Sequence, residues 1–193
     1  NVALIGVMLA ALIIIAVVAY SAWMRLTLPG NDATVVSAGF KAAVKIGGPF
    51  ALTNHFGEKV TASTYLGQYL FIYFGYGYCP DICPTELANM AATLDNLGSA
   101  SAQVQPLFIT VDPERDTVEF LSEYVAQFHP NFVGLTGTPA EIASVAKNYR
   151  VFYRKVESED SSEYLMDHSG FVYLMGPDGL FLTMFRGGTN PES

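Results

Sequence analysis

The chain has 193 residues, and 18 acidic residues against 10 basic ones give it a formal net charge of −8 at pH 7. This charge, without a cluster of lysines or arginines, argues against nucleic-acid binding. Two cysteines are too few for a disulfide scaffold, so we interpret the pair as redox-active or metal-binding.

The first 25 residues predict a membrane anchor. No charged residue precedes Arg25, and residues 2–18 are almost wholly aliphatic. At about 1.5 Å per residue, a helix of this length crosses a hydrocarbon core of roughly 30 Å. Tyr20 and Trp23 stand where aromatic side chains line a membrane interface. A cleaved signal peptide, the alternative, normally has an apolar region of only about 7–15 residues. We therefore interpret residues 1–25 as a single transmembrane helix.

A turn-rich linker and lead-in follow at residues 26–48, and we expect one domain over residues 49–193. Apolar runs bounded by turn residues predict strands at 50–53, 59–61, 69–74, 104–111, 132–135, 171–175 and 180–185. Apolar residues recur at helical spacing in 85–97, 117–128 and 138–149. Acidic, serine-rich residues 157–163 predict a loop. Strands that alternate with helices and close on a hairpin predict an α/β fold with helices on both faces of a sheet.

The segment 69–84 joins a buried strand to a helix and contains both cysteines. Two glycines permit a sharp turn after the strand, and Pro84 is expected as the first helical residue. Cys79 and Cys83 therefore stand at a helix N-terminus, where unpaired N–H groups and the helix dipole favour the thiolate. The thiolate is the form of cysteine that binds metals and attacks disulfides.

The spacing of the two cysteines is compatible with more than one role. Because they are four residues apart, both sulfurs lie on one side of a helix or of a tight loop. Two thiolates with one imidazole make a soft, three-coordinate site that suits Cu(I). Thioredoxin-type redox motifs have two intervening residues rather than three, which weakens a simple oxidoreductase interpretation. Inert buried cysteines are the remaining alternative, and the flanking prolines and the helix N-terminus argue against it.

Three histidines compete as the third ligand. His55 in an Asn-His-Phe-Gly turn and His129 before a proline are expected to be solvated, as polar residues usually are. His168 stands between the acidic loop and a buried strand, where its ring could approach the cysteines. Asp167 beside it could orient the imidazole. By spacing alone, His168 is equally well a ligand or an ordinary loop residue.

A second polar cluster, residues 112–117, follows the predicted strand 104–111. Binding crevices of open α/β sheets lie at such strand ends. We nevertheless favour an Asp–Arg turn followed by Thr117 as a helix cap, because capping groups are common there. Tyr76 and Tyr78 are interpreted either as core aromatics or as a shield and docking surface for the sulfurs.

Taken together, three motifs resemble the Sco (SenC) family. They are Tyr73-Phe74-Gly75-Tyr76 with Cys79-Pro80-Asp81-Ile82-Cys83-Pro84, then Asp112-Pro113-Glu114-Arg115-Asp116-Thr117, then Asp167-His168-Ser169. The resemblance covers about residues 47–192. It implies a thioredoxin-like α/β fold, a central mixed sheet flanked by helices, with copper as Cu(I) or Cu(II) held by Cys79, Cys83 and His168. Gly77 departs from the family, which often has a small hydroxylated residue there.

The resemblance also implies a function and a location. It implies a membrane-anchored copper metallochaperone, rather than an enzyme, that delivers copper to the binuclear copper centre of cytochrome c oxidase subunit II. The alternative is a thiol–disulfide oxidoreductase that reduces the cysteines of that centre through a Cys79–Cys83 disulfide. The oxidase complex and a copper donor protein are the implied partners. The implied location is the bacterial inner membrane with the domain in the periplasm, or else the mitochondrial inner membrane facing the intermembrane space.

Overall fold

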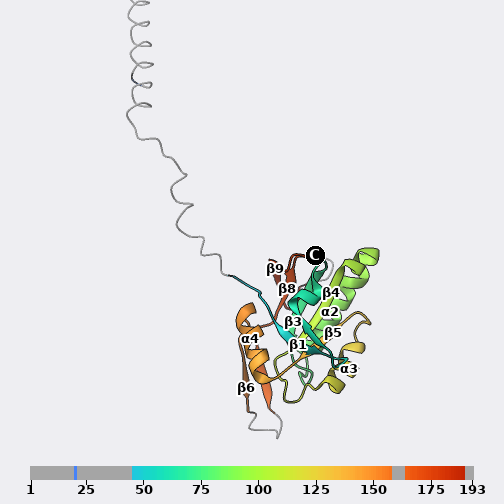
Figure 1. The fold of residues 1–193 in the computed structure, drawn as a ribbon, viewed down its shortest axis with the longest axis vertical. Helices are drawn as coiled ribbons and strands as arrows, with labels where there is room; N and C mark the ends of the chain where they lie inside the picture. Colours follow the sequence, from blue (N-terminus) through green and yellow to red (C-terminus); the bar gives the residue numbers. More distant parts are fainter. Residues whose placement is uncertain (1–19, 21–44, 158–163, 190–193) are drawn as a thin grey trace, which may run out of the picture. The chain divides into compact units, whose positions relative to one another are not determined.

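A computed structural model describes residue 20, residues 45–157 and residues 164–189 (Figure 1). The chain divides into two compact units, 1–44 and 45–193, and the elements described below belong to the second. The predicted anchor, Tyr20 excepted, and the linker up to residue 44 lie outside the described residues, as do residues 158–163 of the predicted loop. Among the residues that are described, no helix has the length and apolar character needed to cross a membrane.

A seven-stranded mixed sheet forms the centre of the domain. In spatial order its strands are β2 (Lys59–Thr61), β1 (Ala51–Asn54), β5 (Val133–Thr136), β4 (Val104–Thr110), β3 (Tyr69–Gly75), β8 (Phe171–Met175) and β9 (Phe181–Arg186). The strands β3, β4 and β5 run parallel, and every other pairing in the sheet is antiparallel. Because β3 and β4 are covered on both faces, their side chains form the continuous apolar runs that predicted them.

The described residues of this domain also form three α-helices and two short 3-10 helices. They are α2 (Ile82–Leu97), α3 (Val118–Ala126), α4 (Pro139–Tyr149), η1 (Ala62–Tyr65) and η2 (Gly98–Gln103). The side chains of Thr117 and Thr138 accept backbone hydrogen bonds and cap α3 and α4. α4 ends at Tyr149, and its C-cap residue Arg150 has a φ of 59°, in the left-handed region. α2 starts at Ile82, before Pro84, the expected first helical residue, and before the predicted stretch 85–97, so Cys83 lies within its first turn.

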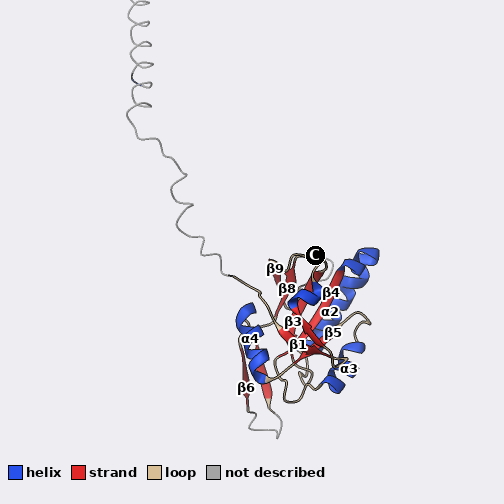
Figure 2. Cartoon of the chain, in the orientation of Figure 1, coloured by secondary structure: helices blue, strands red, loops and turns tan. Residues whose placement is uncertain are grey.

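The helices cover both faces of the sheet, as predicted (Figure 2). On one face, the hydroxyl of Tyr73 in β3 lies 3.7 Å from the sulfur of Cys83 in α2. The partner of Tyr73 in β4, Phe108, packs against an aromatic ring of α3 on that same face. The next residue of β3, Phe74, points the other way and contacts Tyr149 of α4, with 5.4 Å between ring centroids.

A separate two-stranded sheet was not predicted from the sequence. β6 (Tyr153–Val156) pairs antiparallel with β7 (Leu165–His168), and Tyr153 lies directly opposite His168. Both strands mix polar with apolar residues and are half-buried or exposed, so no apolar run marks them. As a result, His168 occupies the last position of a strand rather than a position in a loop.

Candidate metal centre

The two cysteines lie where β3 passes into α2. Cys79 belongs to the loop that follows β3, and Cys83 is the second residue of α2. The N–H of Cys83 donates to the sulfur of Cys79 at 3.3 Å, so the thiol takes the place of a capping side chain at this helix start. Asp81, the N-cap residue, makes no side-chain capping bond. A Cβ on Gly75 would lie 3.0 Å from the Cys83 sulfur, so a larger residue would crowd the site.

His168 brings its ring to the same place from β7. Its Nε2 lies 3.4 Å from the sulfur of Cys83, and its Nδ1 lies 3.2 Å from the carbonyl oxygen of Ser169. A carbonyl oxygen can only accept, so this contact is a hydrogen bond when Nδ1 carries the proton. Nε2 is then left with its lone pair directed toward the cysteines, as a metal ligand requires.

The three potential ligand atoms form one compact group. The sulfurs of Cys79 and Cys83 and a ring nitrogen of His168 all lie within 4.8 Å of one another. Cys83 is fully buried, whereas Cys79 and His168 are half-buried. Two soft sulfurs and one imidazole form a donor set suited to Cu(I) or another thiophilic ion. Two of the three ligands remain within reach of a second molecule.

The surroundings of the two thiols shift their pKa values in opposite directions. Hydrogen bonding from the Cys83 thiol, together with the N–H of Cys83, holds the pKa of Cys79 far below its ordinary value of 9.0. The same hydrogen bond to Cys79, together with burial, raises the pKa of Cys83. Without metal, Cys79 is therefore the thiolate of the pair and Cys83 is the thiol that donates to it.

Tyrosine rings enclose the histidine from two sides. The rings of Tyr73 and Tyr76 meet that of His168 edge-on, with centroids 6.1 Å and 5.8 Å away. Burial raises the pKa of Tyr76 to about 12 and that of Tyr73 further, so both hydroxyls stay protonated at neutral pH. The Tyr73 hydroxyl can thus donate to the sulfur of Cys83. Sequence reasoning assigned no such role to Tyr73, which carried only the pattern of a buried strand.

The cluster at residues 112–117 is the turn and helix cap that we favoured. The Nε of Arg115 lies 2.6 Å from a carboxylate oxygen of Asp112. The guanidinium also stacks over the rings of Tyr78 and Tyr164, 4.8 Å and 3.7 Å from their centroids. The hydroxyl of Tyr164 donates to Asp112 at 2.8 Å. Arg115 therefore links the cysteine loop to the residue that leads into β7.

Asp116 holds the cysteine loop in position, a role that was not predicted for this member of the cluster 112–117. It is fully buried, and its Oδ2 accepts from the N–H of Gly77 at 2.9 Å and from the hydroxyl of Thr110 at 2.5 Å. Burial raises the pKa of Asp116 to about 6. A Cβ on Gly77 would collide with the ring of Phe120, so glycine lets the cysteine loop approach α3 this closely. Asp116 thereby joins that loop to β4.

The other histidines lie outside the Cys-Cys-His group. The expectation that His55 is solvated was wrong: it is only 8% exposed, and its Nδ1 accepts from the N–H of Gly134 at 3.0 Å. His129 lies 3.8 Å from a carboxylate oxygen of Asp95. Asp167, considered from the sequence as an orienting group for His168, instead accepts two hydrogen bonds from Arg154, at 2.7 Å and 2.9 Å. The carbonyl of Ser169 contacts the ring of His168 in its place.

Comparison with known proteins places the chain in a family. The profile of the family described as SCO1/SenC matches residues 39–193. The chain belongs to the SCO1/SenC family. A human SCO1/SenC relative, the mitochondrial protein SCO1 homolog, is 49% identical over 142 residues, which cover 72% of this chain and 47% of the relative. The chain spans about half the length of the curated relatives it matches.

Solved structures of SCO1/SenC proteins have the same fold. Arabidopsis thaliana ScoI with copper bound is 49% identical, with a TM-score of 0.73 over 77% of this chain and 92% of that one. Bradyrhizobium japonicum ScoI with copper bound is 44% identical, with a TM-score of 0.71 over 76% and 93%. These likenesses agree with the expected thioredoxin-like α/β fold.

Proposed function

We propose that the protein is a copper metallochaperone that holds one copper ion through Cys79, Cys83 and His168. The observation that carries the proposal is the compact group of two sulfurs and one imidazole nitrogen within 4.8 Å. The copper-bound structures of the ScoI relatives from Arabidopsis thaliana and Bradyrhizobium japonicum support copper as the metal. When bound, copper would take the place of the proton that the two thiols share.

The site suits transfer of a metal as well as its retention. Its ligand set comprises three residues, so an approaching ligand from another protein can join the coordination sphere without first displacing one. Cys79 and His168 are half-buried rather than enclosed. Beside them, the exposed side chains of Tyr78 and Ile82 offer apolar surface, 45% and 61% exposed, on which a protein acceptor can dock.

The acceptor that we propose is the binuclear copper centre of cytochrome c oxidase subunit II, during assembly of the oxidase complex. Family membership supports this assignment. Residues 1–25 would anchor the protein in the bacterial inner membrane, with the copper-binding domain in the periplasm. A mitochondrial inner-membrane location facing the intermembrane space is the alternative. A copper donor protein would load the site.

Removal of the imidazole tests the proposal. The full chain, reconstituted with Cu(I), should bind one ion with two sulfur neighbours in X-ray absorption spectra, and His168→Ala should weaken binding at least tenfold. The control is His129→Ala, which removes a histidine outside the group and should leave the affinity unchanged. One sulfur neighbour or none, or equal affinities for the two variants, would contradict the proposed site.

The opposite pKa shifts of Cys79 and Cys83 favour a second candidate function, reduction of a disulfide in the acceptor protein. The Cys79 thiolate would attack one sulfur of that disulfide and form a mixed disulfide, and the acceptor's other sulfur would leave as a thiolate. Cys83, losing its proton, would then attack Cys79 and release the second acceptor sulfur. Cys79 and Cys83 end as a disulfide, and two electrons have passed to the acceptor. His168→Ala distinguishes the functions, because copper transfer needs the imidazole and dithiol reduction does not.

A further inference from the structure

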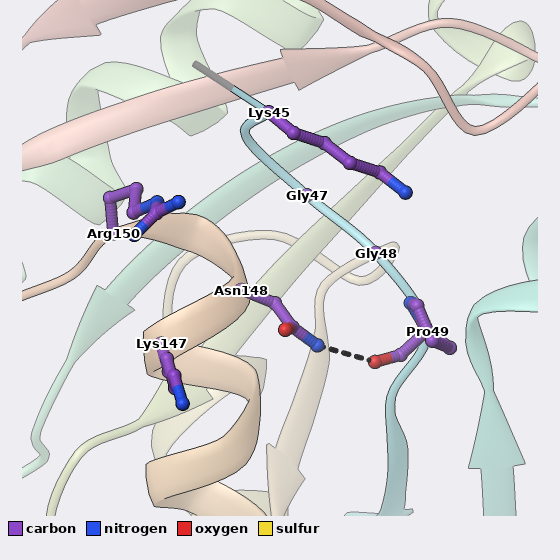
Figure 3. A pocket seen from close by; sticks show the side chains of 7 residues that line it. All are labelled: Lys45, Gly47, Gly48, Pro49, Lys147, Asn148 and Arg150. Atoms are coloured by element: carbon purple, nitrogen blue, oxygen red, sulfur yellow. Dashed lines mark hydrogen bonds between the residues drawn. The ribbon is translucent and has the colours of Figure 1, made fainter.

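A hollow away from the metal centre, beside the end of α4, is lined by several cations. It has a volume of about 190 Å³ and lies between the segment that enters the domain and the last turn of α4. Figure 3 shows the residues that line this basic hollow, and those on which the inference rests are Lys45, Gly47, Pro49, Lys147, Asn148 and Arg150. At roughly 30 Å³ per water molecule, the hollow has room for a phosphate group with part of its hydration.

The charge of the basic hollow is unusual for this chain. The described residues include eight lysines and arginines, and four of these form ion pairs with carboxylates. Of the four that form no ion pair with a described carboxylate, Lys45, Lys147 and Arg150 all line the hollow. No aspartate or glutamate lines it. Within the described part of this acidic protein, of net charge −8, three cations without a carboxylate partner thus lie in one place.

The fold holds the two sides of the basic hollow together. The N–H of Gly47 donates to the carbonyl oxygen of Asn148 at 2.9 Å, and the side-chain amide of Asn148 donates to the carbonyl oxygen of Pro49 at 2.9 Å. Figure 3 shows the second bond crossing between the two segments. Gly47 adopts a φ of 87°, and a Cβ there would collide with Met175 of β8. Lys45 therefore stays close to the end of α4, although the segments are about a hundred residues apart.

Helix chemistry explains only part of this cluster. Cations near the C-terminus of α4 offset its dipole, which is an ordinary role for Lys147 and Arg150. It does not account for Lys45, which comes from a different segment. Arginine presents a planar fork of donors that matches phosphate oxygens, and lysines supply mobile point charges on long stems. The combination suits a phosphate group.

The position of the basic hollow along the chain identifies the source of that phosphate. Nineteen residues separate Lys45 from Arg25, the last residue of the predicted anchor. Even fully extended, they span at most about 65 Å. Basic residues close to a membrane anchor attract anionic lipids. We propose that the basic hollow binds the phosphate of an anionic phospholipid headgroup in the membrane that residues 1–25 are predicted to enter.

The hollow is separate from the metal centre, so the two can be tested independently. Met175, which lies against Gly47, pairs with Leu70 near the beginning of β3, whereas Cys79 follows the end of that strand. Variants at the exposed side chains of Lys45 and Lys147 should therefore leave copper uptake unchanged. Normal copper uptake also reports that such a variant is folded.

Amide chemical shifts of the full chain, in micelles of a neutral detergent, test the proposal. The probes are short-chain phosphatidylglycerol, short-chain phosphatidylcholine and inorganic phosphate. Phosphatidylglycerol should shift the amides of Gly47, Asn148 and Arg150 at concentrations well below those needed for the other two. Equal responses to phosphatidylcholine would overturn the role of the anionic headgroup, and equal responses to inorganic phosphate would overturn a lipid as the source.

Matched charge variants locate the binding. Lys45→Gln/Lys147→Gln should weaken phosphatidylglycerol binding about 25-fold, at about fivefold per cation near an anionic surface. Lys59→Gln/Arg186→Gln removes the same charge elsewhere and should change the affinity less than twofold. Equal weakening in both variants would mean that net charge alone attracts the lipid, and the site would be rejected. The single variant Lys45→Gln should weaken binding about fivefold, and no change would also reject the site.

Discussion

The cysteines and the histidine of the metal centre stand on parts of the molecule that are built differently. Cys79 lies in the loop that joins β3 of the main sheet to α2, and Cys83 is fully buried in the first turn of α2. His168 ends β7, in a two-stranded sheet whose residues are half-buried or exposed. Cys83 thus belongs to the core and Cys79 packs against it, whereas the imidazole of His168 approaches the two sulfurs from a peripheral pair of strands. We expect an acceptor to displace the imidazole first and the thiolates last.

The largest loss of copper binding should come from replacing the two cysteines. Cys79→Ser/Cys83→Ser should abolish Cu(I) binding, because hydroxyl groups do not replace thiolates as soft ligands. Copper stoichiometry after passage over a competing chelator measures the loss. His55→Gln serves as a control, since His55 lies outside the group. If the double variant keeps its copper, the ligands are elsewhere.

The next effect concerns the buried carboxyl that holds the cysteine loop. The pKa of Asp116 is about 6 in the folded protein against an ordinary value of 3.8. Between these values the folded state keeps a proton that the unfolded state has lost, so Asp116 lowers stability as pH rises from about 4 to 6. Two pKa units correspond to about 3 kcal/mol. Asp116→Asn should remove this loss.

Urea unfolding of wild type and Asp116→Asn at pH 4, 5, 6 and 7 measures the difference. We expect the difference between their free energies of unfolding to change by about 3 kcal/mol across this range, with the variant gaining relative to wild type as pH rises. Asp178→Asn, at an exposed turn, is the control and should show the wild-type profile. A constant gap between wild type and Asp116→Asn would contradict the raised pKa.

A smaller effect is expected from the hydroxyl that faces the buried sulfur. Tyr73→Phe keeps the ring and removes the donor 3.7 Å from Cys83. A hydrogen bond to a charged group contributes about 1.5 kcal/mol or more, so Cu(I) affinity should fall about tenfold. Chelator competition measures this, and Tyr153→Phe on the hairpin is the matched control. Unchanged affinity in Tyr73→Phe would mean that the hydroxyl does not support the thiolate.

The smallest effect on stability and copper affinity should come from a change in the peripheral β6–β7 sheet. Arg154→Ala breaks the pair with Asp167, but both side chains are more than half exposed. Exposed pairs contribute about 0–1 kcal/mol, so unfolding free energy and copper affinity should change little. Isothermal unfolding and the same chelator assay check this. A tenfold loss of copper affinity would mean that Asp167 positions His168 after all, and that the hairpin is less peripheral than its exposure indicates.

Local sequence patterns predicted most elements of the sheet and the helices, together with the cysteine pair. Apolar runs and caps are local signals, and the glycines and prolines around Cys79 and Cys83 marked a turn into a helix. The start of α2 was not predicted because the N-cap residue does not cap it. The sulfur of Cys79 accepts the N–H of Cys83 in the first turn instead. No capping pattern describes that arrangement.

The histidines required contacts that no local pattern contains. His168 reaches the cysteines because β7 pairs with β6, and both strands have polar, partly exposed sequences. Only the family resemblance selected it. His55 is buried because β5, about eighty residues later, pairs beside β1 and offers the N–H of Gly134. Burial of a polar side chain by a distant strand is a property of the tertiary fold.

The end of α4 places folding and recognition in opposition. Arg150 holds a left-handed backbone conformation that costs a residue with a side chain about 1–2 kcal/mol and costs glycine almost nothing. Arg150→Gly would therefore relieve the strain while deleting one of three cations from the basic hollow. A sequence optimised for stability alone would have glycine at this position. Arginine at this position makes the end of α4 less stable than glycine would, and in return it supplies a charge to the basic hollow.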